Sequence, residues 1–252
     1  MDTSQTIHTL LNHRSVRNFK DRALDQPTVE QLISVASHTA TSMFMQQFSI
    51  VSVTDPNIKH AFAEITGHKH AANNGHLFVF VADQYRNYLI GQAADESTEL
   101  LGEADRLFAA VYDASIASEA LTTAAESMGL GAVYLGSILN EPQQVIDLLK
   151  LPKLTFPVFA VAVGYPASVP ELKPRLPLET IHFTNQYQLP DNYSTLLNNY
   201  DDKLTDYYQH RGTNARVETF RHNITRQISK SPKHRRTMFT VLQRQGFLLN
   251  ER

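Results

Sequence analysis

Two long apolar runs constrain most strongly what this chain can fold into. They are "LFVFVA" at residues 77–82 and "PVFAVAV" at residues 157–163. Almost every position is apolar, so both faces of each segment must be covered by other parts of the protein. Short runs of this kind, rich in Val and Phe, are typical of buried strands. The two segments therefore predict the inner strands of a sheet with helices on both of its faces.

The remaining patterns complete an α/β sandwich. Two further strand-like runs are "FSIVSV" at 48–53 and "AVYLG" at 132–136. Pro27 and Pro142 stand where first-turn prolines belong, and Asn140 is a good residue to cap the helix that follows it. Amphipathic spacing predicts helices at about residues 3–12, 28–37, 57–65, 105–128, 141–149, 193–209, 214–229 and 233–245.

The segment 105–129 predicts a helix in the core of the protein. Small side chains recur along it and allow other backbones to approach closely; they are Ala110, Ala114, Ala117, Ala120 and Ala124. The segment ends at Gly129, a residue type that commonly terminates helices.

The pattern of regular elements weakens from about residue 165. The stretch "YPASVPELKPRLPLETIHF" at 165–183 contains four prolines, which predicts an extended arm rather than a packed element. We find no repeat and no clean boundary before this point. The sequence therefore predicts a single domain over residues 1–252, with an extended arm at about 165–190 and a basic helical excursion at about 191–252.

Charge is spread unevenly along a chain whose net charge is only −2. Residues 209–252 contain ten Lys and Arg against two acidic residues, whereas the first 208 residues contain 13 basic and 23 acidic groups. A basic tail on an acidic body indicates an anionic partner or a solvated helix face. Nucleic-acid binding is the alternative from another functional class, although the tail lacks the interleaving of aromatic and basic residues typical of stacking platforms.

Composition excludes several other classes. Cysteine is absent, so disulfides, thiolate metal sites and a cysteine nucleophile are excluded. No apolar segment approaches the roughly 18 residues needed to span a membrane. The first residues lack the basic and apolar regions of a signal peptide. We therefore expect a cytoplasmic protein with no membrane partner.

Two short basic clusters raise the question of an anionic ligand. "NHRSVRNFK" at 12–20 follows the first predicted helix, and "KPRLP" at 173–177 lies in the proline-rich arm. In extended chain Lys173 and Arg175 project to the same side and can present two fixed cations to one anion. Taken alone, each cluster is more typical of solvated surface than of an anion site.

Other familiar motifs fail or remain ambiguous. "GLGAVYLG" at 129–136 lacks the third glycine of a dinucleotide fingerprint and precedes a strand instead of following one, so we reject that assignment. His68, His70 and His76 have no carboxylate or thiolate in a recognised pattern, and we expect no metal site. No nucleophile elbow occurs. Thr41, Ser42 and Gln46 precede a strand and suit either a ligand or an ordinary loop.

Taken together and in order, these segments point to one family. They are "HRSVRNF", the Ser/Thr-Gln loop, "LFVFVADQYRN", "AAESMGLGAVYLGSILN", "FPVFAVAVGYP" with "KPRLP", and "RQGFL". The chain resembles the flavin-dependent nitroreductase family, in its NADPH-preferring branch of oxygen-insensitive nitroreductases and NADPH–flavin oxidoreductases. The likeness covers essentially residues 5–250. It implies an α+β fold, a three-layer sandwich with a central, mostly antiparallel sheet, in an intertwined homodimer with FMN at each subunit interface.

The resemblance also assigns candidate cofactor-binding residues. Those expected to bind FMN are His13, Arg14, Ser15, Arg17, Thr41, Ser42, Gln46, His68, Tyr134, Leu135, Gly136, Ser137, Lys173 and Arg175. Two positions depart from the family pattern: His68 stands where relatives commonly have glutamine, and Ser137 where they usually have a second glycine. Either Arg14 or Lys173 is expected to stabilise the reduced flavin.

The resemblance further implies NADPH as co-substrate, with Arg211 and Arg235 as candidates for its 2′-phosphate and Arg216 and Arg236 close behind. Because the cofactor carries the hydride chemistry, no catalytic acid or base is required from the protein. The expected reaction is ping-pong reduction of nitroaromatics, quinones, azo compounds or free flavin. A flavin-binding protein without turnover is a further alternative.

Overall fold

The computed structural model describes residues 4–212, 215–230 and 233–249. Its contacts divide the chain into two compact units. One comprises Met1–Pro170 and Pro232–Arg252, and the other comprises Glu171–Ser231. The predicted organisation, a single domain over residues 1–252 with an extended arm at about 165–190 and a basic helical excursion at about 191–252, stays a prediction.

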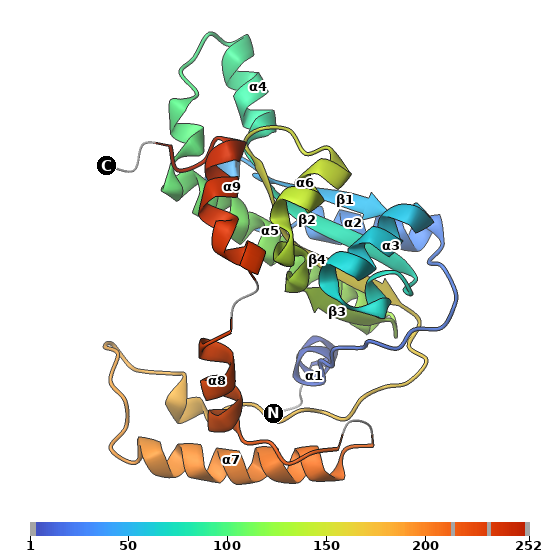
Figure 1. Ribbon diagram of the computed structural model, residues 1–252, viewed down its shortest axis with the longest axis vertical. Helices are drawn as coiled ribbons and strands as arrows, with labels where there is room; N and C mark the ends of the chain where they lie inside the picture. The colour runs from blue at the N-terminus through green and yellow to red at the C-terminus, as the bar shows by residue number, and fades with distance from the viewer. Residues whose placement is uncertain (1–3, 213–214, 231–232, 250–252) are drawn as a thin grey trace. The chain divides into compact units, whose positions relative to one another are not determined.

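A four-stranded sheet forms the centre of the larger unit (Figure 1). Its strands are β1 (Phe48–Val53), β2 (His76–Asp83), β3 (Gly131–Leu135) and β4 (Thr155–Gly164). They lie in the order β1-β2-β4-β3, and every neighbouring pair is antiparallel. All eight residues of β2 are buried. The two apolar runs of the sequence thus form the inner strands, as their lack of polar positions predicts.

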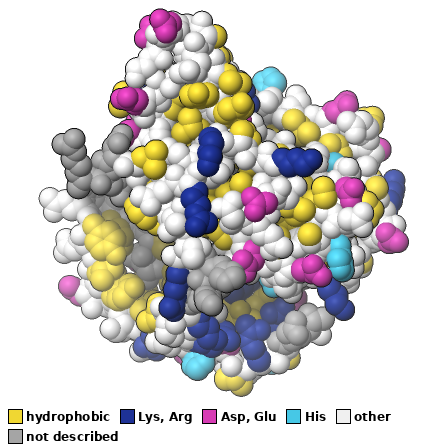
Figure 2. All heavy atoms as spheres, turned by 45° about the horizontal axis from the view of Figure 1, so that its top comes forward, with side chains coloured by type: hydrophobic (Ala, Val, Ile, Leu, Met, Phe, Trp, Pro, Cys, Tyr) yellow, Lys and Arg dark blue, Asp and Glu magenta, His cyan; other side chains and the backbone are white. Residues whose placement is uncertain are grey.

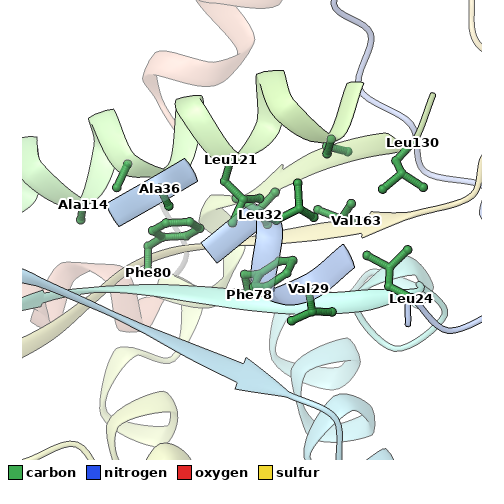
Figure 3. Close-up of a cluster of buried hydrophobic side chains, with 14 residues drawn as sticks. Leu24, Val29, Leu32, Ala36, Phe78, Phe80, Ala114, Leu121, Leu130 and Val163 are labelled. Atoms are coloured by element: carbon green, nitrogen blue, oxygen red, sulfur yellow. The ribbon is translucent and has the colours of Figure 1, made fainter. Parts of the chain in front are cut away.

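One face of the sheet is covered by α2 (Gln26–Ser37) and the long helix α5 (Ala104–Ser127). Their apolar side chains meet Phe78, Phe80 and Val163 in a single buried cluster (Figure 3). Alanines of α5, including Ala114 and Ala117, are fully buried in this cluster. Small side chains therefore bring α5 close to the sheet, as the sequence predicts.

The other face is covered by α3 (Pro56–Thr66), α6 (Pro142–Leu149) and the short 3₁₀ helix Gly136–Asn140. A third cluster joins α9 (Met238–Gln245) to α5 and β4 through Leu107, Phe156 and Phe247. The segment after the second unit therefore completes the core of the first.

Local signals explain where several helices begin. Asp25 and Asp55 cap α2 and α3 by accepting from backbone N–H groups of the first turn. The prediction for Asn140 is wrong: Glu141 occupies the cap position of α6, and the Asn140 amide donates to the Ile65 carbonyl, 3.3 Å away. The Asn140 side chain thus forms a tertiary hydrogen bond instead of capping the helix that follows it.

The predicted strands and most predicted helices are found at nearly the same residues. The remaining helices are α1 (Gln5–Leu11), α4 (Tyr85–Ala93), α7 (Tyr193–His210) and α8 (Phe220–Ile228). Helix α4 carries no amphipathic signal and was not predicted, and α8 begins later than the predicted residue 214. Short 3₁₀ helices occupy Ser42–Phe44, Lys69–Ala71, Glu99–Gly102, Leu178–Thr180 and Lys233–Thr237.

The smaller unit consists of extended chain followed by α7 and α8. Asp201 of α7 accepts from the Arg221 guanidinium of α8 at 2.5 Å, and Tyr200 packs edge-on against Phe220. These contacts fix the two helices against each other. Among the residues that the structure describes, no helix of either unit is both long and apolar enough to cross a membrane.

Candidate active site

The first basic cluster is fixed to the edge of the sheet. Ser15 forms a parallel bridge with Ala132 at the start of β3, and the Val16 N–H donates to the Ala132 carbonyl at 2.9 Å. Gly131 makes this approach feasible, because a Cβ at that position would lie 2.7 Å from Val16 side-chain atoms. The segment His13–Arg17 therefore runs beside β3, whose far end carries the predicted flavin turn.

The two arginines of this cluster have no acidic neighbour among the described residues. Arg14 donates to the Asn12 carbonyl at 2.8 Å, and Arg17 makes only a long contact with the Ser15 carbonyl. His13 is different, because its Nδ1 lies 2.8 Å from Oε1 of Glu126 near the end of α5. Among the described residues, no carboxylate thus neutralises the charge of these two guanidinium groups.

The turn after β3 offers mainly its backbone. The hydroxyl of Tyr134 points to α5, where it lies 3.2 Å from both Ser118 and Thr122 and donates to Glu119 at 3.0 Å. Leu135 is buried in the core. Gly136 is exposed, and a Cβ there would meet nothing within 4 Å. A flat ligand could therefore approach the peptide groups of this turn, but not the Tyr134 hydroxyl.

Burial dominates the electrostatics of Tyr134. Removal of the ring from water raises the pKa of its hydroxyl to about 12, and the nearby Glu119 carboxylate acts in the same direction. Hydrogen bonds from Ser118 and Thr122 oppose the shift. Tyr134 therefore remains a neutral phenol that stabilises the packing of β3 on α5.

Arg235 reaches the same turn from the last segment of the larger unit. Its guanidinium donates to the Gly136 carbonyl, and its Nε donates to the Asn140 side chain at 3.2 Å. Arg235 was predicted to bind NADPH. The structure places it at the predicted flavin turn, where it restrains the backbone of Gly136.

His68 and His70 lie at the start of the short 3₁₀ helix Lys69–Ala71, which precedes β2. Their rings stack with centroids 5.0 Å apart. Burial lowers the pKa of His70 to about 4, and the positive charge of Arg17 contributes, which places Arg17 in the same neighbourhood. Among the described residues, no group of three or more His, Asp or Glu is arranged to hold a metal ion.

The predicted Ser/Thr-Gln loop is anchored to a carboxylate that the sequence analysis missed. Asp113, in the middle of α5, is almost fully buried. It accepts from the Thr41 hydroxyl at 2.5 Å, the Ser42 N–H at 3.1 Å and the Gln47 N–H at 3.0 Å. No short motif announces Asp113; its only signal is an acidic residue on the apolar face of an alanine-rich helix.

Backbone geometry in this loop is unusual. Met43, Phe44 and Gln46 all have positive φ, at 52°, 58° and 49°. A left-handed conformation costs a residue with a side chain roughly 1–2 kcal/mol. Arg86 secures the loop from its other end, because its guanidinium donates to the Gln46 carbonyl at 2.8 Å. The structure thus maintains a strained loop through polar contacts on two sides.

The two predicted groups of the larger unit lie at different levels of α5. The Thr41–Gln47 loop contacts Asp113, whereas the first basic cluster contacts Glu126, 13 residues further along. At 1.5 Å per residue this separation is about 20 Å. Tyr134 lies between these two levels, because its hydroxyl contacts Ser118, Glu119 and Thr122. Arg235 contacts the turn that follows Tyr134. One copy of the chain does not bring the loop into contact with the other group.

The smaller unit gathers three cations around one ring. Lys173 Nζ lies 5.3 Å from the centroid of the Tyr208 ring, and the guanidinium carbons of Arg211 and Arg216 lie 5.6 and 4.0 Å from it. Burial raises the pKa of Tyr208, but the Lys173 hydrogen bond and the three positive charges outweigh that effect and lower it overall. We call Lys173, Arg211 and Arg216 the cation cluster.

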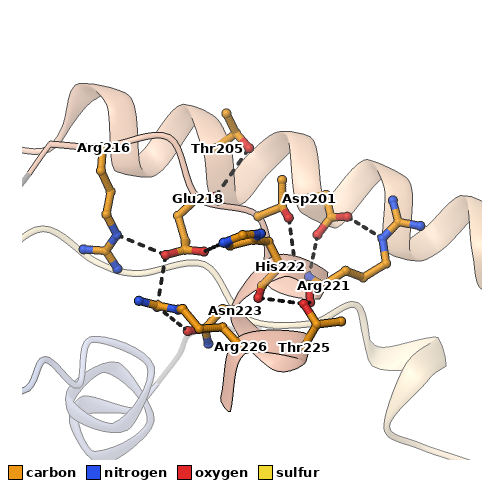
Figure 4. Close-up of polar contacts among 10 residues, drawn as sticks. Asp201, Thr205, Arg216, Glu218, Arg221, His222, Asn223, Thr225 and Arg226 are labelled. Carbon is orange, nitrogen blue, oxygen red and sulfur yellow. Dashed lines mark hydrogen bonds and ion pairs between the residues drawn. The ribbon is translucent and has the colours of Figure 1, made fainter. Parts of the chain in front are cut away.

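A buried carboxylate supports one member of the cation cluster (Figure 4). Glu218 contacts Arg216 at 3.4 Å and Arg226 at 3.1 Å, and the His222 ring lies 3.9 Å away. Among described residues, Lys173 and Arg211 have no such carboxylate within ion-pair distance. Arg175 lies in the extended chain before α7. Burial raises the pKa of Tyr200 on α7, and the charge of Arg175 opposes this rise.

Comparison with known proteins gives this arrangement a family. The family model described as "Nitroreductase family" matches residues 10–165, and that described as "Nitroreductase family, C-terminal domain" matches residues 173–250. Together the two family models cover most of both compact units. The chain therefore belongs to the nitroreductase family and is an oxidoreductase.

Individual relatives agree over nearly the whole chain. An oxygen-insensitive NADPH nitroreductase from Salmonella typhimurium is 40% identical over 245 residues, which cover 97% of this chain and 98% of that protein. An FMN reductase (NADPH) from Bacillus subtilis is 36% identical over 91% of this chain and 94% of its own. The solved structure of the nitroreductase NfrA1 from B. subtilis superposes with a TM-score of 0.93 at 35% identity, covering 98% of this chain and all of that one.

Proposed function

We propose that this protein is an FMN-dependent oxidoreductase that consumes NADPH in a ping-pong reaction. Bound FMN would supply the hydride chemistry that connects NADPH to a second small molecule. The acceptors we expect are nitroaromatics, quinones, azo compounds and free flavin. We further propose that it works in the cytoplasm, where NADPH is available as reductant.

The observation that carries this proposal is the pair of unneutralised guanidinium groups beside β3. Arg14 and Arg17 lie on a segment pinned to the strand whose end opens at Gly136. A phosphate of charge near −2 is the ligand that planar, permanently charged donors suit best. The relatives named for FMN and NADPH support this assignment.

The same cations have a second role in the proposal. Reduction adds negative charge at the N1–C2 carbonyl edge of a flavin, and a fixed cation nearby stabilises it. We assign this role to Arg14 or Lys173, with Arg17 and Arg175 on the phosphate or the ring oxygens. The open backbone of Tyr134–Ser137 and the loop residues Thr41, Ser42 and Gln46 would contact the flavin, with His68 beside them. No side chain is required as proton donor or acceptor.

The cation cluster supports the choice of NADPH. The 2′-phosphate that distinguishes NADPH from NADH needs positive charge, and Arg211 is presented beside Tyr208 without a carboxylate partner among the described residues. Arg216 and Lys173 add to the local potential. Arg235 stays a candidate for NADPH as well, although its donors already serve Gly136 and Asn140.

A homodimer follows from the same geometry. The loop at Asp113 and the basic cluster at Glu126 are about 20 Å apart along α5, so a site that uses both requires a second copy. Large apolar side chains are also exposed on α1 and α5: Ile7, Leu10, Leu11, Phe108, Tyr112 and Ile116. Figure 2 shows that exposed hydrophobic side chains also form patches between the charged ones on one face of the protein. A second copy would cover this surface.

The nucleic-acid alternative finds no support in the tail. Arg216 and Arg226 pair with Glu218, and Arg221 pairs with Asp201. These contacts stabilise the smaller unit and do not form an open basic stripe. Arg252 lies outside the described residues.

Purified protein provides the test of the proposed function. We expect a yellow protein that binds one FMN per chain, and NADPH oxidation with menadione that gives parallel double-reciprocal lines. A colourless protein whose spectrum does not change when FMN is added would overturn the proposal. FMN binding without NADPH turnover would favour a flavin-binding protein that is not an enzyme.

Arg211→Ala tests the assignment of the 2′-phosphate. Loss of this cation should raise the apparent Kd for NADPH in flavin reduction at least tenfold, while the apparent Kd for NADH changes less than twofold. Stopped-flow reduction by each nucleotide measures both effects. Lys203→Ala, which removes an exposed cation from α7, is the matched control and should leave both values unchanged. Equal reduction rates at subsaturating NADPH would remove Arg211 from this role.

A further inference from the structure

The Thr41–Gln47 loop is a folded segment that apolar burial does not hold in place. Met43 and Phe44 are 63% and 80% exposed, although both are large and apolar. Both also have left-handed backbone, which side chains of this kind disfavour. The conformation of the loop must therefore be maintained by other contacts.

Asp113 supplies those contacts. Its Oδ1 accepts from the Ser42 N–H, and its Oδ2 accepts from the Gln47 N–H and the Thr41 hydroxyl. The Thr41 oxygen accepts in turn from the Gln46 N–H at 2.9 Å. One carboxylate thus closes both ends of the loop, and it does so inside α5, where it is 2% exposed.

A buried amide network extends this anchor. The Gln47 side chain, which is fully buried, donates to the Ser42 carbonyl at 3.3 Å and accepts from Gln84 at 2.7 Å. Gln84 also donates to the Arg106 carbonyl on α5 at 2.9 Å. Buried polar groups that satisfy one another in this way favour a single arrangement of the backbone.

The loop so held borders an open pocket. The pocket has a volume of about 610 Å³, and its lining includes Phe44, Gln46, Ile33 and Arg86. Phe44 and Gln46, which have left-handed backbone, both line this pocket. Strain kept at a ligand-binding loop is a common form of preorganisation.

We infer that Asp113 is a positioning residue, which holds the Thr41–Gln47 loop in its flavin-binding conformation before the cofactor arrives. The inference rests on the proposed function, because it takes Thr41, Ser42 and Gln46 as flavin contacts. Asp113 itself touches no ligand in this scheme. Asp113 raises the affinity for FMN, because the loop is already ordered in the FMN-free protein and no free energy is spent on ordering it at binding.

Asp113→Asn is the informative substitution. The two carboxylate oxygens accept from two different backbone N–H groups, so either orientation of an asparagine amide directs its NH₂ group at one of them. At least one anchor is lost, while the volume of the side chain is unchanged. In protein without FMN, we expect amide hydrogen exchange in residues 42–47 to accelerate at least tenfold. We expect the Kd for FMN to rise at least tenfold.

A positioning role also predicts what does not change. At saturating FMN the rate of reduction by NADPH should stay within threefold of the wild-type rate, because the bound cofactor restores the loop. Thr41→Val, which removes only the hydroxyl, should give a smaller rise in Kd. Val145→Ala, a core truncation in the cluster on the other face of the sheet, controls for loss of stability and should leave exchange in residues 42–47 unchanged.

The outcomes separate the two proposals. If wild-type protein binds FMN but Asp113→Asn alters neither its Kd nor exchange in the loop beyond the effect of Val145→Ala, the inference on Asp113 is wrong and the proposed function stands. If the rate at saturating FMN falls as much as the affinity, Asp113 acts in the chemistry and the positioning role is wrong. If wild-type protein binds no FMN, the proposed function and the inference built on it both fail.

Discussion

Single residues in this protein carry functions that depend on what surrounds them. Asp113 and Glu126 are both acids of α5, yet one anchors the Thr41–Gln47 loop and the other binds His13. His76 is a further example. It is buried at the start of β2, its Nε2 has no hydrogen-bond partner in the described part of the chain, and its ring packs on Phe78. Burial, reinforced by the positive charge of Lys59, lowers the pKa of His76 to about 4.

The lowered pKa of His76 predicts a dependence of stability on pH. The unfolded chain binds a proton near the ordinary value of 6.5, whereas the folded protein resists protonation down to about 4. Stability is therefore fully present above pH 6.5 and is lost as the pH falls toward 4. Between pH 7 and pH 5, the free energy of unfolding should decrease about 1–2 kcal/mol more in the wild type than in His76→Gln.

Urea denaturation of FMN-free protein at both pH values measures this difference. His60→Gln is the matched control, since its side chain is 75% exposed and should leave the wild-type dependence intact. Identical pH dependence in wild type and His76→Gln would show that His76 is not held neutral by burial.

Elements meet in this fold through small residues at a few close approaches. Gly75 and Gly164 face each other where β2 begins and β4 ends, and a Cβ on Gly164 would lie 2.7 Å from the Gly75 nitrogen. Gly131 has the same role between β3 and the first basic cluster, where Val16 is the neighbour. The first basic cluster can therefore pack against β3 only because Gly131 has no side chain.

Gly131→Ala should therefore disturb the basic cluster more than the sheet. The new methyl group displaces Val16 and with it Arg14, Ser15 and Arg17, so we expect the Kd for FMN to increase at least tenfold. The double variant with Val16→Gly removes the three side-chain atoms that clash and should recover most of the affinity. Titration of flavin fluorescence measures both. A Kd in Gly131→Ala equal to that of the wild type would contradict the assignment of this segment to the cofactor.

Local sequence signals explain most elements, but not all of them. The four strands and the helices α2, α3, α5, α6 and α7 are found close to where periodicity and caps predict them. Helix α4 was missed because its polar and apolar residues show no helical periodicity. Asn140 was misassigned because a contact with Ile65, distant in the sequence, competes for its side chain. Local preference yields wherever a tertiary partner offers a better hydrogen bond.

The whole molecule leaves apolar surface that one copy does not bury. Helix α5 is shared between the core, the basic cluster and the Thr41–Gln47 loop, and its remaining face carries Phe108, Tyr112 and Ile116. A groove of about 600 Å³ between α1, α2 and α5 includes Ile116 in its lining. The proposed homodimer accounts for this surface and for the separation of the two groups of site residues.

Ile116→Glu should dissociate the proposed dimer. A carboxylate placed at the centre of an apolar interface lacks a partner, and its desolvation opposes association. We expect sedimentation equilibrium to give twice the chain mass of 28.4 kDa for the wild type and a single chain for the variant, with loss of bound FMN. Ile228→Glu, at an exposed apolar position of α8, should leave both properties unchanged. A wild-type monomer that binds FMN would contradict the shared site.

The sequence by itself determined the central strands, the helices that cover them and the presence of two cationic segments, because these follow from side-chain periodicity and residue chemistry along the chain. Its resemblance to the nitroreductases predicted the family that the comparisons confirm. Only the tertiary structure revealed that Asp113 anchors the Thr41–Gln47 loop, that Glu126 contacts His13, and that Lys173, Arg211 and Arg216 converge on Tyr208. The contacts of Asp113 with Thr41, of Glu126 with His13 and of Lys173 with Tyr208 join residues that are far apart in the sequence. Arg211 and Arg216 are close to Tyr208 in the sequence, but only the fold brings Lys173 to the same ring. Their partners are chosen by packing, which no local pattern in the sequence records.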